Sequence, residues 1–100
     1  MGVEVAIEYT VRTRQKTDET WSVLVERAPG HWIASIRLPD GSMWLMSRYE
    51  PRAPALPRQF VGATAAAAAD HAARVLTNFF ANEGMEIVRR RSLLVPQGQA

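Results

Sequence analysis

The side chains that could carry catalysis are few and far apart in this sequence. Its two histidines are His31, beside a predicted turn, and His71, within a predicted helix. Asp70 precedes His71 directly, but neighbouring residues of a helix diverge by about 100°, so the two side chains form no proton relay. Glu4 and Glu8 share one face of a predicted strand at a separation of about 13 Å, too far for a general acid/base pair. We therefore expect no enzyme activity and no catalytic residues.

Motifs that bind cofactors are also missing. The 100 residues contain no cysteine, which excludes disulfides, Cys-ligated zinc, iron–sulfur clusters and thiol nucleophiles. Neither histidine has a second histidine at metal-ligand spacing, and the sequence contains no P-loop, dinucleotide fingerprint or nucleophile elbow. We expect no metal, no cofactor and no small-molecule ligand.

Composition predicts one small domain. A chain of 100 residues, 47% hydrophobic, has room for one domain, which we expect over residues 1–95 with a flexible tail at residues 96–100. The net charge is only +2 although the pI is 9.7, because eleven of the twelve basic residues are arginine. The first eight residues carry two glutamates where a signal peptide needs positive charge, and no window approaches the roughly 20 apolar residues of a membrane span. We therefore expect a cytoplasmic protein. Its fifteen alanines and its bias toward arginine over lysine fit a GC-rich bacterial genome.

Alternating apolar residues predict strands in the first half of the chain. From Val3 to Val11 every odd position is apolar, which predicts a strand whose odd-numbered residues face the core. A second strand alternates in the same way except at Leu24, which indicates a central or partly covered position. Pro39 and Gly41 mark a hairpin turn, because proline presets φ and glycine permits a positive φ. The predicted strands are residues 3–11, 20–27, 32–38 and 43–48.

Residues 49–59 differ in character from the strands before them. Prolines recur at every third position from Pro51 to Pro57, and this spacing favours an extended polyproline II conformation. We expect a Pro-rich strap that leads from the edge of the sheet to the helix. The same spacing matches ligands of SH3-type domains, which are mainly eukaryotic partners.

A long helix is predicted after the strap. Thr64 is suited to cap it, it should run through Glu83, and Gly84 should end it in a left-handed conformation. A short strand over residues 85–90 is expected to follow. The apolar stripe that should face the sheet consists of Ala65, Ala68, Ala69, Ala72, Val75, Leu76 and Phe79.

These elements predict a single α+β domain. The expected architecture is a four- to five-stranded, mainly antiparallel sheet (a β-meander) with one long C-terminal helix packed on one face, in the order ββββαβ. Trp21 and Trp32 have the same facing parity on neighbouring strands, so both should lie under the helix.

The segment that follows the hairpin turn is too apolar for a strand with one wet face. Either the strap covers its outer side or a partner does, because a large exposed apolar patch usually marks an interface. An edge strand here could also pair with its copy in another chain. The candidate protein interface is Met43, Trp44, Leu45, Met46 and Tyr49.

Arginines gather in the second half of the chain. If those beside the strap and those at the last strand converge near an aromatic side chain, they form a surface suited to single-stranded nucleic acid. Ordinary solubilising charge is the competing interpretation, and Arg90 should lie on the opposite side of its strand from Arg89 and Arg91. The candidate polyanion contacts are Arg48, Arg52, Arg58, Arg89, Arg90 and Arg91.

The order of elements resembles that of two known domain types. Strands followed by Gly-x-Trp-x-Ala-Ser from Gly30 to Ser35, a helix opening at residues 62–64 and a strand after Gly84 are similar to the N-terminal domains of HicB-type antitoxins. That resemblance covers roughly residues 22–88 and implies a small sheet, one helix and a partner toxin. This chain differs by its extra N-terminal strand, its inserted segment at residues 43–57 and its alanine-rich helix. The strand–strand–strand–helix order also resembles double-stranded-RNA-binding folds, although their lysine-rich helix start is absent.

The functional expectation is a small non-enzymatic interaction module that binds another protein or a second copy of itself. Weak nucleic-acid binding through the arginines is the first alternative, and a HicB-like partner binder is another. An enzyme with a site assembled around His31 would require a polar cleft beside that residue.

Overall fold

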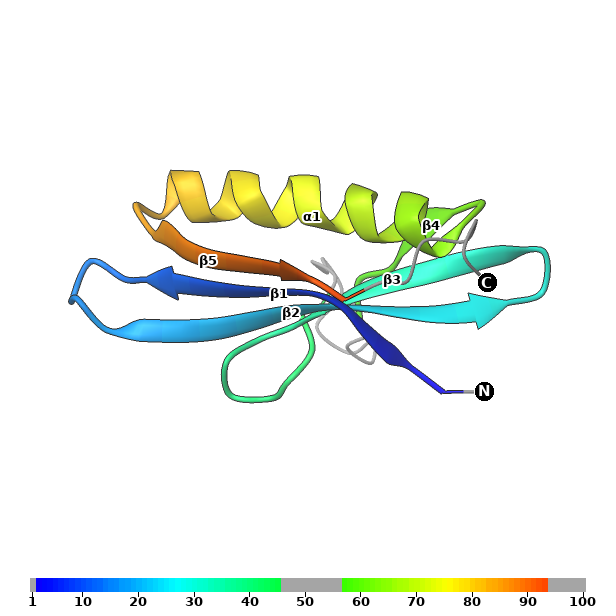
Figure 1. Ribbon diagram of the computed structural model, residues 1–100, viewed down its shortest axis with the longest axis horizontal. Coiled ribbons are helices and arrows are strands. Elements are labelled where there is room, and N and C mark those ends of the chain that lie inside the picture. The colour runs from blue at the N-terminus through cyan, green and yellow to red at the C-terminus, as the bar shows by residue number, and fades with distance from the viewer. Residues whose placement is uncertain (1, 46–56, 94–100) are drawn as a thin grey trace, which may run out of the picture.

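In residues 2–45 and 57–93, which the computed structural model describes, five antiparallel strands form one twisted sheet and one helix lies along one of its faces (Figure 1). The order of elements is ββββαβ, which confirms the predicted α+β fold. The elements are β1 (Glu4–Arg12), β2 (Asp18–Ala28), β3 (His31–Arg37), β4 (Phe60–Gly62), α1 (Ala65–Asn82) and β5 (Glu86–Ser92).

The sheet has the strand order β4-β3-β2-β1-β5, so the first four strands form a meander and β5 adds to the far side of β1. Because β4 and β5 lie at opposite edges, α1 carries the chain across the whole sheet. The hydroxyl of Thr64 accepts a hydrogen bond from the amide of Ala67 at 3.0 Å, and Gly84 adopts a φ of +70° just beyond the helix. Both predicted ends of the helix are thereby confirmed.

The core lies between α1 and the helix-facing side of the sheet. Alanines at the start of α1 have no bulk beyond Cβ and allow close approach to β3 and β4, whereas Leu76 and Phe80 fill the wider space near β1 and β2. The predicted stripe is wrong at its end: Phe80 is 1% exposed, and Phe79 is only partly buried. The buried face is rotated toward Phe80 because that ring packs edge-on against Tyr9 and Trp21.

The predicted face of the first strand is wrong before Ala6. The register of β1 on β2 shifts between Val5 and Ile7, where a β-bulge interrupts the pairing. Ile7 lies opposite the helix-facing Val23, but Val5 lies opposite Leu24, which points the other way. Successive side chains of a strand point to opposite faces of the sheet. One extra residue therefore places Val3 and Val5 on the face opposite to the one that the alternation predicts.

The predicted fourth strand at residues 43–48 is also wrong in its position. Met43 makes a single bridge to Arg37 and Leu45 a single bridge to Pro57, while the fourth strand is β4. One edge of β3 is paired with β2, and β4 occupies the first half of the other edge. The segment that returns from the hairpin turn, residues 43–45, can therefore pair only with the end of β3. Residues 46–56, which include most of the predicted strap, lie outside the described residues, as does the predicted tail at residues 96–100.

The last strand runs two residues beyond its predicted end. Its pairing with β1 shifts between Thr10 and Val11, whose partners are Arg89 and Ile87, so Val88 is the extra residue of a second bulge. This bulge accounts for two adjacent apolar residues in an otherwise alternating strand. Among the described residues, no helix has the length and apolar character that a membrane crossing requires.

Candidate interaction surface

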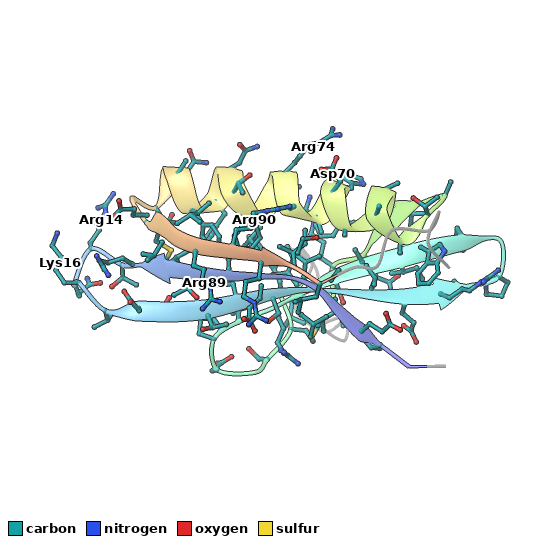
Figure 2. The ribbon with its side chains drawn as sticks, viewed as in Figure 1. Arg14, Lys16, Asp70, Arg74, Arg89 and Arg90 are labelled. Atoms are coloured by element: carbon teal, nitrogen blue, oxygen red, sulfur yellow. The ribbon has the colours of Figure 1, made fainter. Side chains whose placement is uncertain are left out.

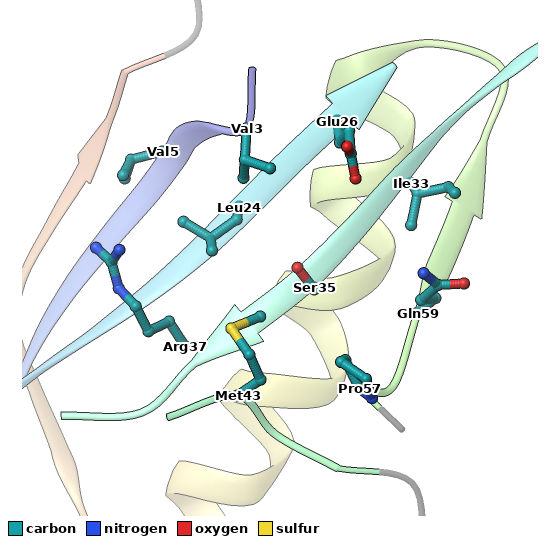
Figure 3. Close-up of a pocket in the computed structure, with 10 residues that line it drawn as sticks. All are labelled: Val3, Val5, Leu24, Glu26, Ile33, Ser35, Arg37, Met43, Pro57 and Gln59. Carbon is teal, nitrogen blue, oxygen red and sulfur yellow. The ribbon is translucent and has the colours of Figure 1, made fainter. Parts of the chain in front are cut away.

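The face of the sheet opposite α1 carries an apolar hollow. Its apolar side chains come from β1, β2, β3 and the segments on either side of the undescribed residues, and they point to the same side while α1 lies behind the sheet (Figure 3). The hollow has a volume of about 390 Å³. We name its apolar side chains the outer patch: Val3, Val5, Leu24, Ile33, Met43 and Pro57.

Strand β2 is buried on both faces in its central part. An antiparallel sheet with one wet face alternates buried and exposed residues, but five consecutive residues of β2, from Trp21 to Val25, are buried. Ser22 and Leu24 point away from the helix and are nevertheless only 3% and 8% exposed. Side chains of the outer patch therefore form a second, thinner apolar layer on the face that α1 leaves uncovered.

The bulge in β1 builds part of this layer. Without it, Val3 and Val5 would lie under the helix, as the alternation of the sequence predicts. With it, Val5 lies beside Leu24, and Val3 is 55% exposed at the margin of the hollow. Bulges re-aim side chains at functional surfaces. The broken alternation at Leu24 and the apolar character of the segment that contains Met43 are the signals of this face in the sequence, whereas nothing in the pattern marks the bulge.

Opposite charges lie at the two ends of the outer patch. Along β2 and β3, Glu26 pairs with Ile33, Leu24 pairs with Ser35, and Ser22 pairs with Arg37. The two charged positions are thus four residues, or about 13 Å, apart along the strands. Arg37 donates a hydrogen bond to the Ser22 hydroxyl at 3.4 Å. Within the described part of the chain, neither Glu26 nor Arg37 takes part in an ion pair.

The described residues of the predicted interface, Met43, Trp44 and Leu45, line a second hollow together, and Met43 also borders the first. Met43 belongs to the outer patch, and Leu45 is 46% exposed. Trp44 instead packs on the helix side, with ring centroids 6.1 Å from Trp21 and 4.9 Å from Phe79. Its amide donates to the carbonyl of Ile36 at 2.8 Å, which fixes the returning segment beside β3. The other two predicted residues, Met46 and Tyr49, lie outside the described residues.

The second hollow, of about 460 Å³, lies beside this aromatic cluster. Trp21, Trp44 and Phe79 line it together with side chains of the hairpin turn. The indole nitrogen of Trp21 is buried and has no hydrogen-bond partner among the described atoms. Trp21 packs its ring against Trp44, Phe79 and Phe80, and this aromatic cluster joins the segment at Trp44 to α1.

The described arginines do not gather in one place. Arg58 lies next to β4, with its guanidinium 5.0 Å from the ring centre of Phe60. The other described candidates, Arg89, Arg90 and Arg91, belong to β5 at the opposite edge of the sheet, about 19 Å away across four strand spacings. Figure 2 shows Arg89 and Arg90 leaving β5 on opposite sides, as the sequence predicts. Arg90 donates to the hydroxyl of Tyr9 at 3.3 Å, and Arg91 lies 3.6 Å from Glu8.

The remaining two candidates, Arg48 and Arg52, lie outside the described residues. Of the described candidates, Arg58, Arg90 and Arg91 make contacts within the fold, and the four do not form one basic surface. Nucleic-acid binding through these residues stays a prediction.

The two histidines lie on different elements. His31 begins β3, and His71 packs its ring edge-on against Phe60 at 5.2 Å. Among residues 2–45 and 57–93, no three His, Cys, Asp or Glu side chains are grouped so that they could hold a metal ion. In the hairpin turn, hydrogen bonds from the hydroxyl and amide of Ser42 lower the pKa of the Asp40 carboxyl.

Comparison with known proteins finds no match to a protein family, to a curated protein or to a solved structure. The resemblance to HicB-type antitoxin domains therefore rests on the order of elements and on the motif from Gly30 to Ser35. Function has to be argued from the surface of this chain itself.

Proposed function

We propose that this chain is a non-enzymatic protein-interaction module and that the outer patch is its contact surface. The observation that carries the proposal is the row of partly exposed apolar side chains on the face that α1 leaves uncovered, where Val3 is 55% exposed and Ile33 and Met43 are half-buried. An apolar layer on a sheet face that borders water is unfavourable unless a partner covers it, since about 25 cal/mol is gained for each Å² of apolar surface removed from water.

The form of the outer patch favours a protein partner over a small molecule. Small-molecule sites enclose most of their ligand, with a few converging polar groups. Here the hollow is shallow and spans several strands, and its charged side chains stand at opposite ends rather than converging (Figure 3). An apolar centre with a polar rim is the usual arrangement of a protein interface.

Site-specific photo-crosslinking tests this function. A benzoylphenylalanine placed at Ile33, which lies half-buried in the outer patch, should form adducts with protein in cells of the native host. The same probe at Asn78, exposed on the far side of α1, is the matched control and should form few. If position 33 forms no adducts, or no more than position 78, the outer patch is not a contact surface and the proposal fails.

A further inference from the structure

We propose that the occupant of the outer patch is a second copy of this chain, bound face to face about a two-fold axis that runs across the strands. This inference rests on the proposed function and adds the identity of the partner. It starts from the two charges at the ends of the patch, which have opposite sign and no ion-pair partner among the described residues.

The symmetry of the charges follows from the strand register. Leu24 and Ser35 form the middle pair of the patch, with Glu26 two residues away in one direction and the Ser22–Arg37 pair two residues away in the other. A second copy turned end over end about an axis through the middle pair places its Arg37 above Ile33, the cross-strand partner of Glu26, so the arginine faces Glu26 diagonally across one strand spacing of about 4.8 Å, and its Glu26 faces Arg37 in the same way. The two-fold axis therefore generates two ion pairs from one pair of residues, as a self-complementary interface requires.

The size of the face allows a weak dimer. The five strands contain 9, 11, 7, 3 and 7 residues, which at about 3.3 Å per residue and about 4.8 Å between strands cover roughly 590 Å². That area is below the roughly 800 Å² that each partner contributes to a standard protein interface, so we expect a dimer that forms only at high concentration. Two sheets packed in this way would form a β-sandwich with α1 on each outer side.

Charge reversal tests the arrangement because each single variant should repel itself. In Glu26→Arg, both ends of the patch are positive, and in Arg37→Glu both are negative. Sedimentation velocity over micromolar to near-millimolar concentrations should show wild type rising toward twice the chain mass of 11.1 kDa. Each single variant should dissociate about tenfold more readily, since two attractive pairs become repulsive.

Mixing the two single variants is the decisive step. The mixture should form a heterodimer with both ion pairs restored, to within about threefold of wild-type affinity, as should the double variant Glu26→Arg/Arg37→Glu. Glu83→Arg, a charge reversal beyond the end of α1, is the control and should dimerise like wild type. Ile33→Lys should abolish the dimer while the fluorescence of buried Trp21 reports an intact fold.

Two results would overturn the inference. One is a wild-type chain that stays monomeric at every concentration, and the other is a dimer that the charge reversals and their mixture leave unchanged. If crosslinks from position 33 then lead to a different protein, the outer patch is still a contact surface and only the second copy is wrong. If position 33 forms no crosslinks either, the proposed function fails as well.

Discussion

At the residue scale, Gly62 lies where β4 closely approaches the first turn of the helix. A Cβ built there would meet the backbone of the first helical turn, at the amide of Ala68 and within 2.8 Å of the carbonyl carbon of Ala67. Because backbone cannot yield as a flexible side chain does, Gly62 has to remain without a side chain if β4 is to pass directly under α1.

Replacing Gly62 by alanine should lower the free energy of unfolding by about 1–3 kcal/mol, the usual cost of forcing an extra methyl group into a packed site. Chemical denaturation followed by tryptophan fluorescence measures the change. Gly2→Ala is the matched control, since a Cβ at Gly2 meets nothing within 4 Å. Equal stability of Gly62→Ala and wild type would show that β4 and α1 are not in this close contact.

The hairpin turn after β3 offers a test by pH. The Ser42 hydroxyl donates to Asp40 at 2.6 Å and is the main cause of the lowered pKa of that carboxyl, whose ordinary value is 3.8. A lowered pKa means that the carboxylate stabilises the turn at neutral pH and that this contribution is lost as the pH falls below 3.8 through the folded value. Ser42→Ala should raise the pKa of Asp40 toward its ordinary value in an NMR titration. Ser42→Thr keeps the hydroxyl and should leave the pKa low; a pKa unchanged in Ser42→Ala would contradict this assignment.

At the scale of elements, the buried face of the helix agrees with its predicted apolar stripe at the start and is rotated from it at the end, where Phe80 rather than Phe79 is buried. Phe80 is buried between Tyr9 and Trp21, and Phe79 borders the second hollow beside Trp44. Phe80→Ala should therefore cost about 3–5 kcal/mol, as expected for a large aromatic ring removed from a core.

Phe79→Ala should cost less and should loosen the segment around Trp44. Denaturation midpoints give the two costs, and the emission of Trp44 in a Trp21→Phe/Trp32→Phe background reports the loosening. If Phe79→Ala proved the more destabilising, the buried face would be the one that the sequence pattern predicts.

Elements with strong local signals were predictable from the sequence, whereas shifts in the register between paired strands were not. Helix α1 has a capping residue, a long periodic stripe and a terminal glycine, and its bounds agree with prediction to within about one residue. The bulge at Ala6 has no such signal, because the apolar alternation continues through it. Strand β4 is only three residues long and comes directly after residues 49–59, which their prolines mark as a linker.

The candidate surface was less predictable than the fold for the same reason. Apolar character drew attention to Met43, which lies in the outer patch, but the bulge that adds Val5 to the outer patch depends on pairing with β2 rather than on local sequence. Tryptophan is a residue type common at protein interfaces, yet Trp44 packs toward the helix because Phe79 of α1 lies against its ring. Which side of a strand is buried is decided by its tertiary neighbours.

At the scale of the whole molecule, the chain is a two-layer fold whose helix covers one face of a sheet (Figure 1). Charged side chains of α1, such as Asp70 and Arg74, project away from the sheet and pair with each other at 2.8 Å (Figure 2). The opposite face combines the outer patch with the charges of Glu26 and Arg37. One face of the sheet thus packs against the helix to form the core, and the other face is the one that we propose binds a partner.

The most direct test of the account is an isotope-filtered NOE measurement on an equal mixture of methyl-labelled and unlabelled chain at a concentration where the chain associates. Contact between two outer patches predicts intermolecular NOEs from the methyl groups of Val5, Leu24 and Ile33, and none from Val75 on α1. Intermolecular NOEs that arise only from α1 or β5, or none at all, would show that the outer patch does not join two copies of this chain.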